Sequence, residues 1–251
     1  MITVVLVDLA AAAEGLFRIE QETPRLSEPE LARAAAIADA GRRAAWLAAH
    51  SALRVVLERA TGPSVRRQAY ETGAHGRPWL SGGPAFSLSH TAGLAAIAVA
   101  SDGALGVDVE ARRVVAVTGP RRALLMAAAA ALGPAPADLI DAWARLEAVG
   151  KARGSGVGAV LEALRRRPVR AAADEAGAEE SGAGAAMRSL AAGLALHDLA
   201  VPEGYAGALA ASVHLGPPRL AWLPATPDAL RAFAAVSNAV DLAEPAGHKG
   251  A

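Results

Sequence analysis

The sequence predicts an α+β protein made of two similar α/β lobes, with a boundary near residue 112. Helical and strand patterns occur in two successive rounds, first over residues 30–110 and then over 121–213. The segment AGLAAIAV at 92–99 also resembles the segment AGALAASV at 206–213. We therefore expect an N-terminal lobe at 1–112, a C-terminal lobe at 113–225, and a C-terminal helix with a polar tail at 226–251.

A first strand is expected at residues 1–8, and the first round then begins with a helical pattern over residues 30–60. Apolar residues recur at helical spacing through this segment, and Thr61-Gly62-Pro63 ends it. Glycine and proline indicate loops over residues 73–84. Three strands are expected next, at 85–88, 94–100 and 105–110.

The second round begins with a predicted helix at 121–132, and Asp138 is a suitable N-cap for a helix that runs to residue 152. Gly154 would end that helix. Residues 165–184 show no clear periodicity and indicate a mobile loop. Two strands at 194–199 and 206–213 would complete the round, and a short helix would follow Pro224.

The composition excludes several classes of function. The 251 residues include no cysteine, so disulfides, thiolate catalysis and cysteine metal sites are excluded. The net charge is zero, which gives no indication of binding to nucleic acid or to an anionic membrane. No segment has the roughly 18 apolar residues that span a bilayer, and the first residues lack the basic start of a signal peptide. We expect a cytoplasmic monomer.

Three elements carry residues suited to chemistry, and the first is Phe86-Ser87-Leu88-Ser89-His90-Thr91. Alternation places Phe86 and Leu88 on the core side of a strand, and it places Ser89 and His90 at the strand's end. An imidazole and hydroxyl groups at such a position can bind a phosphate or a ribose. On its own, the element is also explained by a structural histidine in a turn.

The second element is Gly106-Val107-Asp108-Val109-Glu110. Residues i and i+2 of a strand share a face, so Asp108 and Glu110 should point the same way while the two valines point into the core. Two neighbouring carboxylates repel each other unless a cation lies between them, and hard oxygen ligands suit Mg²⁺. On its own, the pattern also fits a strand with one solvated acidic face.

The third element is the helix segment 143–157, in which Trp143, Glu147 and Lys151 fall on one stripe. The chain has two lysines, Lys151 and Lys249, so twenty-three of its twenty-five basic residues are arginines. A compact ammonium near a phosphate is a reason to retain a lysine here. An ordinary surface pair of Glu147 with Lys151, worth about 0.3–0.5 kcal/mol, is the alternative.

The order and spacing of these elements resemble those of the 4′-phosphopantetheinyl transferases, specifically the larger two-lobed class that activates peptide and polyketide synthetases. That class carries a Gly-Lys-Pro-like element, matched by Gly76-Arg77-Pro78, and an F-x-x-S-H-S/T element, matched by residues 86–91. It then carries G-x-D-x-E, matched by 106–110, and W-x-x-K-E-A-x-x-K-x-x-G-x-G, matched by 143–156. The resemblance covers residues 30–215 and implies two α/β lobes related by pseudo-two-fold symmetry.

The resemblance also implies a site for Mg²⁺, or alternatively Mn²⁺, and for coenzyme A as substrate. The metal ligands would be Asp108, Glu110 and Glu147, which hold the metal against the pyrophosphate of coenzyme A. The coenzyme A site would include Arg77, Ser89, His90, Asp108 and Lys151.

Two residues depart from the family pattern. Leu146 stands where many members have a lysine or another polar residue before the helix glutamate. Ala45 stands where many have an arginine that reaches the 3′-phosphate, so Arg42, Arg43 or Arg33 would have to make that contact. Both departures concern affinity for coenzyme A more than the reaction.

The implied activity is transfer of the 4′-phosphopantetheine arm of coenzyme A to a serine of an apo acyl or peptidyl carrier protein, with release of 3′,5′-adenosine bisphosphate. Such transferases serve fatty acid, polyketide and nonribosomal peptide biosynthesis. Glu147 would take the serine proton, and Lys151 would stabilise charge on the reacting phosphates. Two alternatives use the same residues: a Mg²⁺-dependent phosphohydrolase, and a non-catalytic module that binds coenzyme A or a carrier protein.

Overall fold

The structure is a computed structural model, and it describes residues 1–73, 76–165 and 182–236. Within these ranges the chain forms eight α-helices and three small sheets, which confirms the predicted α+β class. The chain divides into two compact units. The first comprises Met1–Gly103 and the described part of Leu215–Ala251, and the second comprises Ala104–His214.

The sheet of the first unit has the strand order β4-β5-β1-β9. Antiparallel pairing joins β4 (Ala85–His90) to β5 (Leu94–Ala100) and β5 to β1 (Ile2–Asp8). The last strand, β9 (Pro218–Trp222), lies parallel to β1. The two central strands are aliphatic and buried along nearly their whole length.

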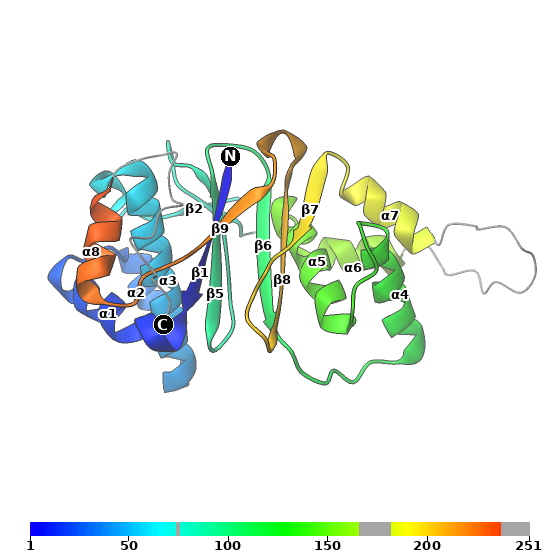
Figure 1. The fold of residues 1–251 in the computed structure, drawn as a ribbon, viewed down its shortest axis with the longest axis horizontal. Coiled ribbons are helices and arrows are strands. Elements are labelled where there is room, and N and C mark those ends of the chain that lie inside the picture. The colour runs from blue at the N-terminus through cyan, green and yellow to red at the C-terminus, as the bar shows by residue number, and fades with distance from the viewer. Residues whose placement is uncertain (74–75, 166–181, 237–251) are drawn as a thin grey trace, which may run out of the picture. The chain divides into compact units, whose positions relative to one another are not determined.

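Two helices, α1 (Leu9–Glu22) and α3 (Ala40–Thr61), pack on this sheet (Figure 1). Helix α8 (Pro227–Ala235) packs on α1 and α3 and adds to the same core, and α2 (Glu28–Ala35) packs on α3. The helical pattern predicted over residues 30–60 is therefore two helices rather than one. The chain breaks between them because Asp39 caps α3 by accepting a hydrogen bond from Arg42 N at 2.7 Å.

The segment predicted as loops contains a small hairpin of β2 (Glu71–Thr72) and β3 (Pro78–Trp79). Short 3₁₀ helices occur at Pro63–Val65 and Val213–Leu215. Every helix in the described ranges is too short or too polar to cross a membrane.

The second unit is built on the antiparallel sheet β6-β8-β7, formed by β6 (Leu105–Ala111), β8 (Tyr205–Ser212) and β7 (Leu194–Asp198). Helix α5 (Leu139–Ala152) packs on β6 and β8. Helices α4 (Gly119–Ala130) and α6 (Gly156–Arg165) pack on α5, and α7 (Gly182–Leu190) packs on α4 and α6 (Figure 1). The alanine-rich sequence did not predict α6 or α7, and residues 166–181 of the expected loop lie outside the described residues.

The division of the chain differs from the lobes expected at 1–112 and 113–225. Strand β6 belongs to the second unit because it pairs with β8, although it directly follows the first unit in sequence. Strand β9 belongs to the first unit because it pairs with β1. The polar tail after residue 236 lies outside the described residues.

Candidate functional site

Asp108 and Glu110 lie on the face of β6 that α5 covers. Their partners in β8 are Ala208 and Ala206, and both alanines belong to the apolar core beneath the helices. Asp108 is only 2% exposed. The sequence pattern correctly groups the two acids on one face of the strand. The helices of the second unit pack on this acidic face and not on the face that carries the two valines.

Gly106 brings the strand and the helix into close contact. A Cβ atom built on Gly106 would lie less than 3 Å from the Ala148 oxygen, the Ala152 nitrogen and the Lys151 carbonyl carbon. No side chain fits at such separations, so only glycine lets the backbone of α5 approach β6 this closely. The motif glycine therefore sets the distance between the acidic strand and the helix that carries Glu147.

Lys151 is the residue that joins the strand to the helix chemically. Its Nζ lies 2.6 Å from Asp108 Oδ1 and donates a second hydrogen bond to the Val107 carbonyl oxygen at 3.1 Å. The same ammonium is 3.9 Å from Glu147 Oε2, one helical turn earlier. Lys151 is thus not an ordinary surface lysine paired only with Glu147, because its closest carboxylate is a buried one on another element.

Negative charges converge around Glu147. Burial raises the pKa of Glu147, and the negative charges of Asp108 and Glu110 raise it further, while the ammonium of Lys151 opposes this. Glu110 also has a cationic partner, since Arg113 Nη1 lies 2.7 Å from its Oε2. Three carboxylates therefore share a small region of the second unit with the cations of Lys151 and Arg113.

The chemistry of this donor set fits a hard divalent cation. All three candidate ligands are carboxylate oxygens, and the pKa of Glu147 is raised first by burial and then by the negative charges of Asp108 and Glu110, which such a cation would offset. In the described residues, however, no three His, Asp or Glu side chains are already arranged as metal ligands. Metal binding would therefore require some of these side chains to move, and Lys151 lies among them.

Two arginine clusters that the sequence did not indicate hold α5 in place. Arg112, directly after β6, pairs with Asp138 at 2.6 Å and with Asp141 at 2.8 Å, so it links the strand to the start of the helix. Arg145 is buried on α5, and its guanidinium pairs with Asp198 at the end of β7. The sequence did contain one signal for the first cluster: two adjacent arginines, at 112 and 113, directly follow the acidic strand, and such a charge pattern indicates ion pairs.

The remaining predicted residues lie in the first unit on three different elements. Arg42 and Arg43 occupy the first turn of α3, where Arg43 Nη1 donates to the Ile37 carbonyl oxygen at 2.8 Å. Arg77 precedes β3, and burial lowers the pKa of its guanidinium. Ser89 and His90 end β4 as expected, and Phe86 and Leu88 face the core as the alternation predicts.

The structure also explains both departures from the family pattern. Leu146 is fully buried in the apolar core of the second unit, where a lysine would need a partner for its charge. Ala45 packs against the core of the first unit, while the neighbouring Arg42 is exposed. Arg42 is therefore better placed than residue 45 to offer a cation to a ligand in solution.

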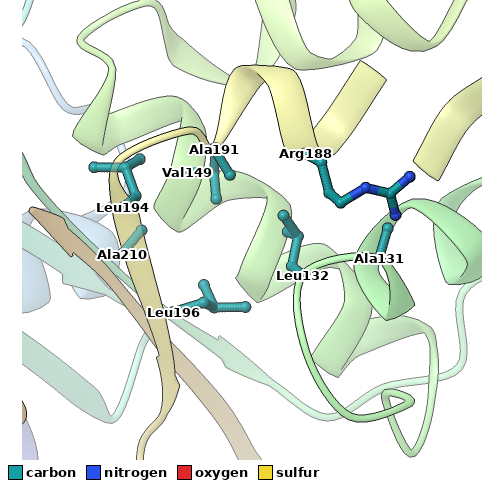
Figure 2. A pocket seen from close by; sticks show the side chains of 8 residues that line it. All are labelled: Ala131, Leu132, Val149, Arg188, Ala191, Leu194, Leu196 and Ala210. Carbon is teal, nitrogen blue, oxygen red and sulfur yellow. The ribbon is translucent and has the colours of Figure 1, made fainter. Parts of the chain in front are cut away.

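A pocket of about 150 Å³ in the second unit does not coincide with these residues (Figure 2). Its lining consists of three leucines, three alanines, Val149 and Arg188. A single cation in an apolar lining is poorly suited to a diphosphate, and the pocket includes none of the predicted site residues. Apart from Arg188, its walls are aliphatic side chains.

Comparison with models of known protein families finds no match to this chain, and comparison with curated proteins finds none either. The functional interpretation therefore depends on the site residues themselves.

Proposed function

We propose that this protein is a 4′-phosphopantetheinyl transferase, which moves the phosphopantetheine arm of coenzyme A to a serine of an apo carrier protein. One observation carries the proposal: Lys151 lies 2.6 Å from Asp108, 43 residues away in the sequence. The two motif elements thus converge in space, as a shared active site requires. The proposal includes the finer fold assignment, in which two similar α/β lobes are related by pseudo-two-fold symmetry.

Binding of coenzyme A requires compensation of its negative charge. Asp108, Glu110 and Glu147 would hold Mg²⁺ or Mn²⁺, which would neutralise charge on the diphosphate when bound. Lys151 would place its ammonium against the phosphoryl oxygens. Arg42, Arg43, Arg77, Ser89 and His90, all in the first unit, are the further residues that the sequence pattern assigns to coenzyme A.

The reaction is a displacement at the phosphorus that bears the pantetheine arm. The carrier serine Oγ forms a bond to this phosphorus, and the bond to the bridging oxygen of 3′,5′-adenosine bisphosphate breaks. Glu147, which lies on α5 one helical turn before Lys151, takes the serine proton. Lys151 stabilises the charge that develops on the phosphoryl oxygens and on the leaving phosphate.

Mass spectrometry of carrier proteins tests the proposed function. Incubation with coenzyme A, Mg²⁺ and a panel of apo carriers should add one phosphopantetheine arm to at least one carrier, and a chelator should prevent the addition. The variant Glu147→Gln should abolish transfer while the protein remains folded. Hydrolysis of coenzyme A without any carrier would instead identify a phosphohydrolase. Binding of coenzyme A without transfer to any carrier would identify a non-catalytic module.

Helix α4 offers a surface for the carrier protein. Arg121 and Arg122 are exposed in its first turns, and Leu124 and Met126 are partly exposed beside them, whereas Leu125, also expected to contact the carrier, is buried. Carrier helices beside the acceptor serine are often acidic, so these arginines complement them.

The double variant Arg121→Glu, Arg122→Glu is expected to raise KM for the carrier at least about fivefold, the effect of roughly 1 kcal/mol per charge pair in water. Coenzyme A affinity, measured by calorimetry, should not change. An unchanged carrier KM would place docking elsewhere.

A further inference from the structure

The ammonium of Lys151 is enclosed by groups that prefer a cation. Its neighbours are Asp108 Oδ1 at 2.6 Å, the Val107 carbonyl oxygen at 3.1 Å and Glu147 Oε2 at 3.9 Å. These are three oxygens from two elements, and two of them belong to residues that the proposed function assigns to the metal. The side chain is nevertheless 29% exposed, so the ammonium can leave towards solvent.

Lys151 and a divalent cation would compete for Asp108. A metal ligated by Asp108 and Glu147 must approach within about 2.1 Å of their oxygens, while Nζ is 2.6 Å from one of these carboxylates. Both cations cannot occupy this space, because unit charges a few ångströms apart repel strongly at a site shielded from water. Among the described residues no three acids are arranged as metal ligands, as expected if Lys151 neutralises these carboxylates while no metal is bound.

We propose that Lys151 is the internal counter-ion of the metal-free site, and that it is displaced from Asp108 when the divalent cation binds. This inference rests on the proposed function, because it takes Asp108 and Glu147 as the metal ligands. Displacement frees the ammonium for the phosphates of coenzyme A, so the same side chain first keeps the buried carboxylate paired and then contacts the substrate. The flexible four-carbon stem of lysine allows this movement, whereas a guanidinium would hold a carboxylate with a rigid fork.

Metal affinity without coenzyme A tests the displacement directly. The variant Lys151→Met keeps the length of the side chain and removes its charge. It is expected to bind Mn²⁺, measured by electron paramagnetic resonance, at least roughly fivefold more tightly than the parent protein, as removal of one repelling charge predicts. The matched control is Arg122→Met, which removes an exposed charge of the same unit that pairs with none of these acids. Its Mn²⁺ affinity should equal that of the parent.

A second measurement uses the unaltered protein and does not depend on how the variant folds. The chain has only two lysines, so reductive methylation followed by mass spectrometry can follow Lys151 with Lys249 as the internal reference. Mn²⁺ should increase the rate at Lys151 relative to Lys249, because a displaced amine is more accessible and no longer hydrogen-bonded to Asp108.

The outcomes separate this inference from the proposed function. Equal or weaker Mn²⁺ binding by Lys151→Met, or a methylation ratio that does not change with Mn²⁺, would overturn the counter-ion role even if the enzyme transfers the arm. Absence of transfer to any carrier would instead refute the proposed function, while tighter Mn²⁺ binding by the variant would still show that Lys151 competes with the metal.

Discussion

Replacement of Lys151 by arginine is expected to lower kcat at least about tenfold, a barrier increase of roughly 1.4 kcal/mol, while the fold remains almost as stable as that of the parent. Arginine keeps the positive charge and can still pair with Asp108, so most of the stabilisation should survive. Its guanidinium is wider and planar, however, and it cannot occupy the position of a compact ammonium beside the Val107 carbonyl and the phosphates. Steady-state kinetics of carrier modification, combined with urea unfolding, measure both quantities.

The variant Lys151→Ala should lose more activity than Lys151→Arg, chiefly in kcat rather than in carrier KM. It should also be less stable, because a 2% exposed carboxylate loses a cationic partner, which costs about 1–3 kcal/mol. If both variants transferred the arm at nearly the parent rate, Lys151 would have a structural role only. The pairing with Glu147 alone would not predict these losses, since an exposed pair of this kind contributes only about 0.3–0.5 kcal/mol.

The second large effect is expected for Gly106→Ala. The added methyl group would meet the backbone of α5 at Ala148 and Ala152, and backbone atoms cannot rotate away as the end of a side chain can. The helix must shift or the strand must bend, so the free energy of unfolding should fall by at least about 2 kcal/mol, within the range for overpacked cores. Transfer activity should fall as well, because the shift moves Glu147 on α5 away from Asp108 and Glu110 on β6.

Gly158→Ala is the matched control for this substitution. Gly158 lies on α6 in the same unit, it is exposed, and no atom lies within 4 Å of a Cβ built there. Alanine in a helix is more favourable than glycine by about 0.8–1.0 kcal/mol, so this variant should be slightly more stable than the parent. Guanidinium unfolding of the two variants compares them directly. A Gly106→Ala protein as stable as the parent would mean that the close contact of β6 with α5 is not required.

Local signals in the sequence predicted much of the second unit correctly. Asp138 caps α5 by accepting hydrogen bonds from Ile140 N and Asp141 N, as a side chain of this type at a helix start does. Gly154 follows the end of the same helix with a φ of +66°, a left-handed backbone conformation that favours glycine. These features were predictable because each depends on a few neighbouring residues.

Features that depend on distant partners could not be predicted. The alternation in β6 grouped Asp108 with Glu110, but it could not show that α5 would cover their face. Strand β9 was missed because its five residues show no clear pattern, and only pairing with β1 defines it. The partners of Arg112 and Arg145 lie 26 to 53 residues further along the chain, so local sequence patterns could not identify which acids they bind.

The pairing of β9 with β1 affects the order in which the units can form during synthesis. Strand β1 starts at Ile2, but its parallel neighbour β9 starts only at Pro218, after the whole of the continuous second unit has been made. The second unit can therefore complete its fold on the ribosome first, while an edge of the first sheet still lacks its neighbour. Until residue 222 emerges, that open edge of β1 is available for unwanted strand pairing, so a strand translated after the second unit protects a strand translated before it.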